Sequence, residues 1–96
     1  MTAVLNTDQF IDAAANVFDA LVPVASDDEL FASGYLRGHF DLAVGTLQVE
    51  AQPFTASDVI NQVNNTLTQA IANGELSEQD QQLVNAIWQR LQQLSA

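Results

Sequence analysis

His39 is the residue of this sequence best suited to acid–base chemistry, because imidazole is the side chain whose ordinary pKa lies near neutrality. Tyr35, Arg37 and Asp41 lie close to it along the chain. A lone arginine on a strongly acidic protein can anchor a carboxylate or the backbone of a partner. Tyr35, Arg37, His39 and Asp41 are therefore the candidate interaction residues.

A purely structural role explains the same residues. At about 100° per residue of helix, Arg37 and Asp41 fall on a polar side with Ser33, whereas His39 falls nearly opposite, beside Tyr35. A buried imidazole is usually packed and hydrogen-bonded rather than reactive. Arg37 and Asp41 are also spaced for a weak surface ion pair. Both interpretations remain open at this point.

The sequence lacks the residues that most catalytic and metal sites require. There is no cysteine, and therefore no disulfide, thiolate nucleophile or cysteine-based metal site. The histidine is not preceded by the glutamate of a di-iron Glu-x-x-His motif. No Ser-His-Asp order, glycine-rich phosphate loop or Walker lysine is present. We predict no catalytic residue, no cofactor and no metal site.

The net charge restricts the partners. Twelve acidic residues stand against two arginines, which gives a formal net charge of −10. Such a surface repels the phosphates of nucleic acids and the anionic leaflet of a membrane, so neither is an expected partner. The segment Met1–Asp12 has neither the basic region of a secretory signal nor the apolar stretch of a membrane span. We expect a cytoplasmic protein.

Helices must position these side chains. Apolar residues recur at three- and four-residue intervals from Asn6 or Thr7 to about Val22, which predicts a first helix. Ser26 and Glu29 form a capping box that opens a second helix, from Asp27 to about Val49. This second helix is apolar around most of its circumference, so we expect it to lie between the others and to be covered on most sides.

Gly34, Gly38 and Gly45 lie along one line of the second helix. Each costs about 0.5–1 kcal/mol of helix stability relative to alanine. We expect the close approach of a neighbouring backbone or bulky side chain to compensate for that cost.

A short linker precedes a third helix, which Thr55 or Ser57 opens and Gly74 ends. Ser77 caps a fourth helix, whose apolar seam includes Trp88 as a core residue. The short turn between these two helices predicts that they are antiparallel neighbours.

Four helices with short connections predict an all-α fold with one domain over residues 1–96. We expect a four-helix bundle, either up-down or an orthogonal array, with the second helix central. The apolar excess of that helix is covered either by its own bundle or by a second copy of the chain, so a homodimer remains open.

Two segments resemble a known family. SDDELFASGYLRGHFDL, residues 26–42, closely resembles the YfcL-like family of small uncharacterised proteobacterial proteins, and GELSEQDQQLV, residues 74–84, is similar to a second stretch of that family. The resemblance covers most of the chain, from the second helix to the fourth. It implies a helical fold in a bacterial cytoplasmic setting and carries over no catalytic or binding residue.

Two functions follow as hypotheses. Small size, strong acidity and the lack of a catalytic set favour a protein-interaction or regulatory module with a protein partner. The alternative is a small-molecule-binding helical bundle with a pocket near Tyr35, Arg37 and His39, where the glycines leave space between helices.

Overall fold

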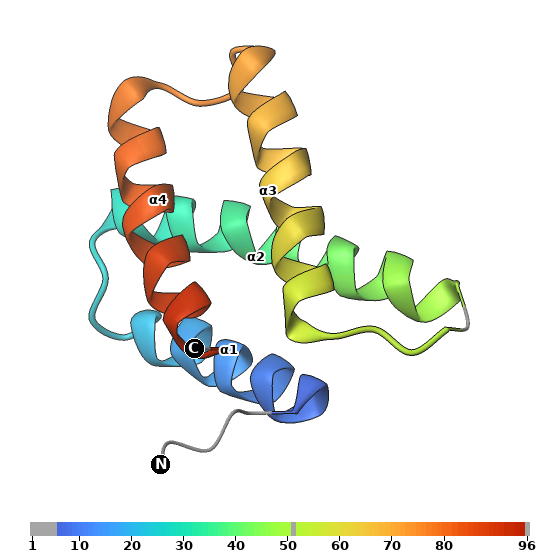
Figure 1. The fold of residues 1–96 in the computed structure, drawn as a ribbon. Helices are drawn as coiled ribbons and strands as arrows, with labels where there is room; N and C mark the ends of the chain where they lie inside the picture. The colour runs from blue at the N-terminus through green and yellow to red at the C-terminus, as the bar shows by residue number, and fades with distance from the viewer. Residues whose placement is uncertain (1–5, 51, 96) are drawn as a thin grey trace.

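A computed structural model describes residues 6–50 and 52–95, and every regular element in them is a helix. The helices are α1 (Thr7–Leu21), α2 (Asp27–Val49), α3 (Ala56–Ala72) and α4 (Glu78–Gln93) (Figure 1). The predicted all-α class and its four helices are confirmed. None of these four helices combines the length and the hydropathy that crossing a membrane requires.

Each helix begins after a residue whose side chain caps it. The caps are Asn6, Ser26, Thr55 and Ser77, of which the first three form capping boxes with Gln9, Glu29 and Asp58. At the start of α2, the Glu29 N–H donates to Ser26 Oγ at 3.2 Å and the Ser26 N–H donates to Glu29 Oε1 at 3.0 Å. The bond from the Ser26 backbone, and then the one with its side chain, lower the pKa of Glu29. The predicted capping box of α2 is confirmed.

A Schellman turn at Gly74 ends α3. Gly74 has a φ of 75°, a left-handed conformation that glycine adopts without a steric penalty. Its N–H donates to Ile71 O at 3.0 Å, and the Glu75 N–H donates to Ala70 O at 3.1 Å. Leu76 follows and is buried. The predicted stop at Gly74 is therefore confirmed.

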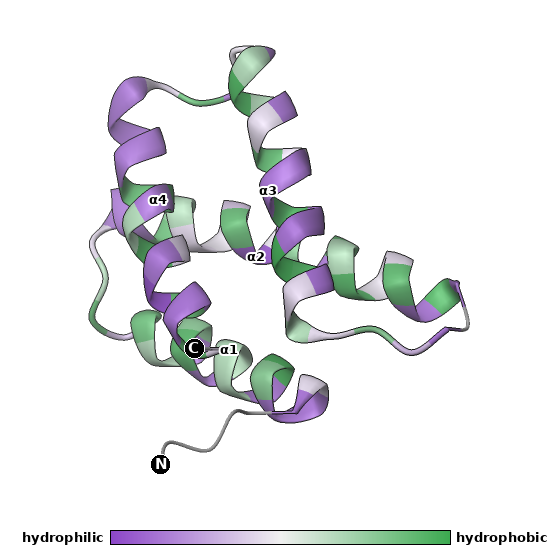
Figure 2. Cartoon of the chain, in the orientation of Figure 1, coloured by the Kyte–Doolittle hydropathy of each residue, from purple (hydrophilic) through white to green (hydrophobic). Residues whose placement is uncertain are grey.

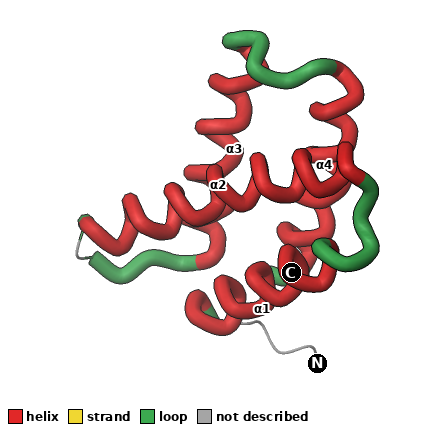
Figure 3. Tube along the Cα trace, turned by 180° about the vertical axis from the view of Figure 1, so that it is seen from behind, coloured by secondary structure: helices red, strands yellow, loops and turns green. Residues whose placement is uncertain are grey.

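α2 is the central element, because the other three helices all pack against it. In both views α3 and α4 run across α2 rather than alongside it, which is the orthogonal arrangement (Figures 1 and 3). α3 and α4 run antiparallel, as predicted, and each packs mainly on α2. The buried Trp88 joins them through a hydrogen bond of 2.7 Å from its Nε1 to Asn64 Oδ1.

The core lies where the other helices cross α2. Its aromatic centre is Phe40 of α2, whose ring centre lies 5.8 Å from that of Phe10 and 6.1 Å from that of Phe18, both on α1. At the edge of the core, Thr7 Oγ1 donates to the Phe54 carbonyl at 2.9 Å. This bond ties the start of α1 to the linker before α3.

The expectation that α2 is covered on most sides is wrong. Its buried residues share one arc and are Ala32, Ser33, Leu36, Phe40, Ala43 and Val44. Ser33, expected on the polar side, therefore faces the core. On the opposite arc, Phe31 is 52% exposed, Leu42 64% and Val49 85%. The physical reason is that α1, α3 and α4 all approach α2 from the same side.

The glycines of α2 also lie away from the core, so the expected close approach of a neighbour is wrong as well. A Cβ atom placed at Gly34, Gly38 or Gly45 would meet no neighbouring atom of the described chain within 4 Å. No contact among the described residues therefore compensates for the helix stability that these glycines give up.

Candidate functional site

The exposed side of α2 forms a continuous apolar seam. Its positions alternate four and three residues apart and are Phe31, Tyr35, Gly38, Leu42, Gly45 and Val49. This alternation keeps residues on one side of a helix and is the spacing by which helices pack against helices. We call these six residues the open face of α2. The end of α2 extends past α3, and in Figure 2 this part carries green, hydrophobic bands between pale and purple ones.

The open face is hollowed over its last turns. A depression of about 540 Å³ is lined by Asp41, Leu42, Gly45, Thr46, Val49 and Glu50. Gly45 has no side chain, which leaves a gap between Leu42 and Val49. At about 100° per residue, Asp41 and Glu50 fall on opposite flanks of the seam. The depression therefore combines an apolar floor with negatively charged flanks.

Tyr35 is tied to the turn between α3 and α4. Its hydroxyl donates to Glu75 Oε1 at 2.9 Å. Burial, the hydrogen bond with Glu75 and the charge of that carboxylate raise the pKa of Tyr35 to about 12. The ring lies 6.1 Å from that of Phe31 and 4.8 Å from that of His39, centre to centre. Tyr35 thus forms one edge of the open face and connects it to the Schellman turn.

His39 is half-buried against α3, where its Nδ1 lies 2.8 Å from Thr66 Oγ1. The Thr66 hydroxyl donates its proton to the Val63 carbonyl at 3.1 Å. Thr66 Oγ1 therefore lies within hydrogen-bond distance of both the His39 ring and the Val63 carbonyl. This is the hydrogen-bonded imidazole of the structural interpretation, although it is only half-buried.

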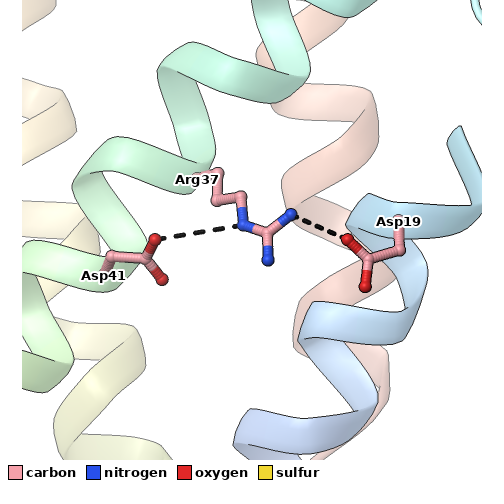
Figure 4. A network of polar contacts seen from close by, with 3 residues as sticks. All are labelled: Asp19, Arg37 and Asp41. Carbon is pink, nitrogen blue, oxygen red and sulfur yellow. Dashed lines mark hydrogen bonds and ion pairs between the residues drawn. The ribbon is translucent and has the colours of Figure 1, made fainter. Parts of the chain in front are cut away.

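Arg37 lies between two carboxylates (Figure 4). Its Nη1 donates to Asp19 Oδ1 of α1 at 3.0 Å, and its Nε lies 3.9 Å from Asp41 Oδ2. The guanidinium carbon also lies 5.5 Å from the ring centre of Phe18. The side chain of Arg37 is 39% exposed, so these pairs position it more than they stabilise the fold. Residue spacing predicted the pair with Asp41, but not the shorter bond with Asp19.

The four candidate residues do not converge on one pocket. Tyr35 and His39 contact the α3 side through Glu75 and Thr66, whereas Arg37 and Asp41 lie on the flank that faces α1. The open face runs between the two pairs. Their role in an interaction stays a prediction.

Sequence reasoning missed the residues between the two pairs, namely Phe31, Leu42 and Val49. The four-three spacing of the six-residue seam to which they belong is the signal that could have identified them. Within the described ranges, no three His, Cys, Asp or Glu side chains gather as a metal ion requires.

Comparisons with known proteins agree with the resemblance. Residues 8–93 match the family described as YfcL protein. The chain is also 48% identical over 75 residues to uncharacterized protein YfcL of Escherichia coli (strain K12), a match that covers 78% of this chain and 80% of that protein. The comparison with solved structures gives no match. Since the family match spans all four helices, the chain belongs to the YfcL family.

Proposed function

We propose that this protein is an interaction module of the bacterial cytoplasm that binds another protein through the open face of α2. The observation that carries the proposal is the exposure of Leu42 and Val49, at 64% and 85%. Single exposed apolar residues are common on protein surfaces, but a row of them on one side of a helix is typical of an interaction surface.

Of the predicted interaction residues, Tyr35 belongs to this surface and the other three border it. Tyr35 and His39 lie along one edge, and Arg37 and Asp41 lie along the other. Arg37 has donors that its bond with Asp19 leaves unused, because a guanidinium carries five N–H groups. In the proposed contact, Leu42 and Val49 supply apolar area, and the bordering polar side chains fix the orientation of the partner.

A small-molecule site is the second candidate, and the depression favours it by its volume of about 540 Å³, which lies in the range of ligand pockets. The residues that line it come from α2 and its C-cap alone, so they can cover a small ligand on one side only. Tyr35 Oη and His39 Nδ1 are already bound within the protein. The open face therefore supports a protein partner better than a small molecule.

The proposal is tested by site-specific photo-crosslinking in a native bacterial extract. A photoreactive residue at Leu42 is expected to give a discrete adduct that the same residue at the exposed Gln69 of α3 does not give. The Leu42 adduct is also expected to weaken when Val49→Asn is added. Identical adducts at Leu42 and Gln69, or none at Leu42, would contradict the proposed function.

A further inference from the structure

We infer that the open face of α2 takes a basic amphipathic helix of another protein. The apolar side chains of this helix lie over Gly38 and Gly45, and its Lys and Arg residues flank them beside Asp41 and Glu50. The inference rests on the proposed function and adds the chemistry of the partner to it.

The shape of the open face matches a helix. Along the seam, the large side chains of Phe31 and Tyr35 are followed by a gap at Gly38, and Gly45 leaves a second gap between Leu42 and Val49. A partner side chain can enter each gap, which is how the knobs of one helix enter the holes of another. The depression over Gly45 is such a hole.

The length of the open face sets the length of the partner. Phe31 and Val49 are the first and last residues of the seam, and at 1.5 Å per residue they lie about 27 Å apart along the axis of α2. A partner helix of about five turns would therefore cover it.

The charges around the open face are acidic. Asp41 and Glu50 line the depression, and Asp27 and Asp28 occupy the first turn of α2. Arg37, the basic residue of α2, is already bonded to Asp19 at 3.0 Å and lies 3.9 Å from Asp41. Lys and Arg on the flanks of a partner helix would therefore complement this surface.

A second copy of this chain fits the same face poorly. It would bring an identical set of carboxylates against the first set, since the chain carries a net charge of −10 with two arginines as its basic residues. Like charges placed opposite each other across an interface destabilise it. A basic partner would place positive charges opposite these carboxylates, whereas a homodimer would place negative charges opposite them.

The first experiment uses three fluorescent peptides of about 18 residues, the length set by the open face. One carries Leu at alternating three- and four-residue intervals with Lys and Arg on the flanks. The second has the same composition in scrambled order, and the third carries Glu in place of Lys and Arg. Fluorescence anisotropy is expected to show binding of the first peptide alone, and equal binding of the scrambled peptide would overturn the inference, because it would reflect charge alone.

Two matched double variants test whether the peptide binds at the open face. Asp41→Asn with Glu50→Gln is expected to raise the Kd of the basic peptide about threefold to tenfold at low salt. Asp12→Asn with Glu78→Gln removes the same charges from exposed positions elsewhere and is expected to change the Kd less than about twofold. Equal effects of the two double variants would overturn the inference.

Two further variants test the apolar contribution to peptide binding separately from the contribution of the charges. Leu42→Ala removes an apolar anchor and is expected to raise the Kd about tenfold. Gly45→Leu fills the hole without meeting a neighbour at its Cβ, and is expected to weaken binding at least as much while the protein stays folded. Undiminished binding by a folded Gly45→Leu protein would overturn the inference.

The outcomes distinguish this inference from the proposed function. A Leu42-specific adduct in the extract, together with no binding of the basic peptide, overturns the inference and leaves the proposed function in place. A dimer in sedimentation equilibrium that Leu42→Ala dissociates would instead assign the open face to a second copy. Failure of both the crosslink and the peptide removes the function and the inference together.

Discussion

The two sides of α2 contain similar large apolar residues but differ at their small positions. The buried side places Ala32 and Ala43 between its large residues, and both are at most 2% exposed. The open face places Gly38 and Gly45 between Leu42 and its other large residues. Alanine fills a packed core and favours a helix, whereas glycine leaves gaps and weakens it. The buried side therefore packs against neighbours within the chain, whereas the open face is the side to which we assign the proposed partner.

The largest expected contrast is between two phenylalanines of α2. Phe40→Ala removes the centre of the aromatic cluster with Phe10 and Phe18 and is expected to lower the free energy of unfolding by about 3–5 kcal/mol. Phe31→Ala, on the open face, is expected to cost less than about 1 kcal/mol, because the ring is already 52% exposed. Urea unfolding followed by the fluorescence of Trp88, the single tryptophan, measures both. Similar losses for the two variants would show that the open face is covered in solution.

A smaller contrast in stability is expected when glycine and alanine are interchanged at one position on each side of α2. Gly38→Ala is expected to raise the free energy of unfolding by about 0.5–1 kcal/mol, since its Cβ meets nothing within 4 Å and the helix gains propensity. Ala43→Gly on the buried side is expected to lower it by about 1–2 kcal/mol, because helix propensity and a packed methyl group are both lost. Thermal unfolding measures both changes. Gly74→Ala is the control, and it is expected to destabilise because φ at this position is 75°.

The smallest expected effect on stability comes from Tyr35, at the edge of the open face, and it is measured by titrating this residue. Its pKa of about 12 in the folded protein exceeds the ordinary value of 10.0. The resulting stabilisation is fully present below the pKa of the unfolded state and is lost as the pH rises through about 12. Since Tyr35 is the single tyrosine, the phenolate absorbance reports it directly.

Two controls accompany this titration. Glu75→Gln removes the charge and is expected to move the midpoint back towards the ordinary value, although burial still raises it. Urea-unfolded protein supplies the unperturbed reference. A folded midpoint equal to the unfolded one would show that Tyr35 Oη is free in water, and that the edge of the open face is not held by Glu75.

Sequence reasoning located the helices well because their ends depend on local signals. The box of Ser26 and Glu29 and the stop at Gly74 each involve residues within one turn, so their chemistry can be read from neighbouring positions. It did not locate the uncovered side of α2. That side depends on the direction from which α1, α3 and α4 approach, and a helix that is apolar nearly all round gives no preference.

The candidate site was predictable in part for the same reason. The spacing of Arg37 and Asp41 is local and predicted their proximity, which the structure has at 3.9 Å. The bonds from Arg37 to Asp19 and from His39 to Thr66 join residues far apart in the chain. Such bonds follow from the tertiary arrangement and have no sequence signal of their own.

The central position of α2 determines how we expect the whole protein to unfold. Because α1, α3 and α4 all pack on α2, loss of that helix removes the shared core of the others, so unfolding is expected to be a single cooperative event. The slowest amide hydrogen exchange should then lie in the middle of α2. A ligand bound to the outer side of α2 would stabilise the folded state by mass action and so slow amide exchange throughout the protein. Amides far from the ligand would therefore report its binding.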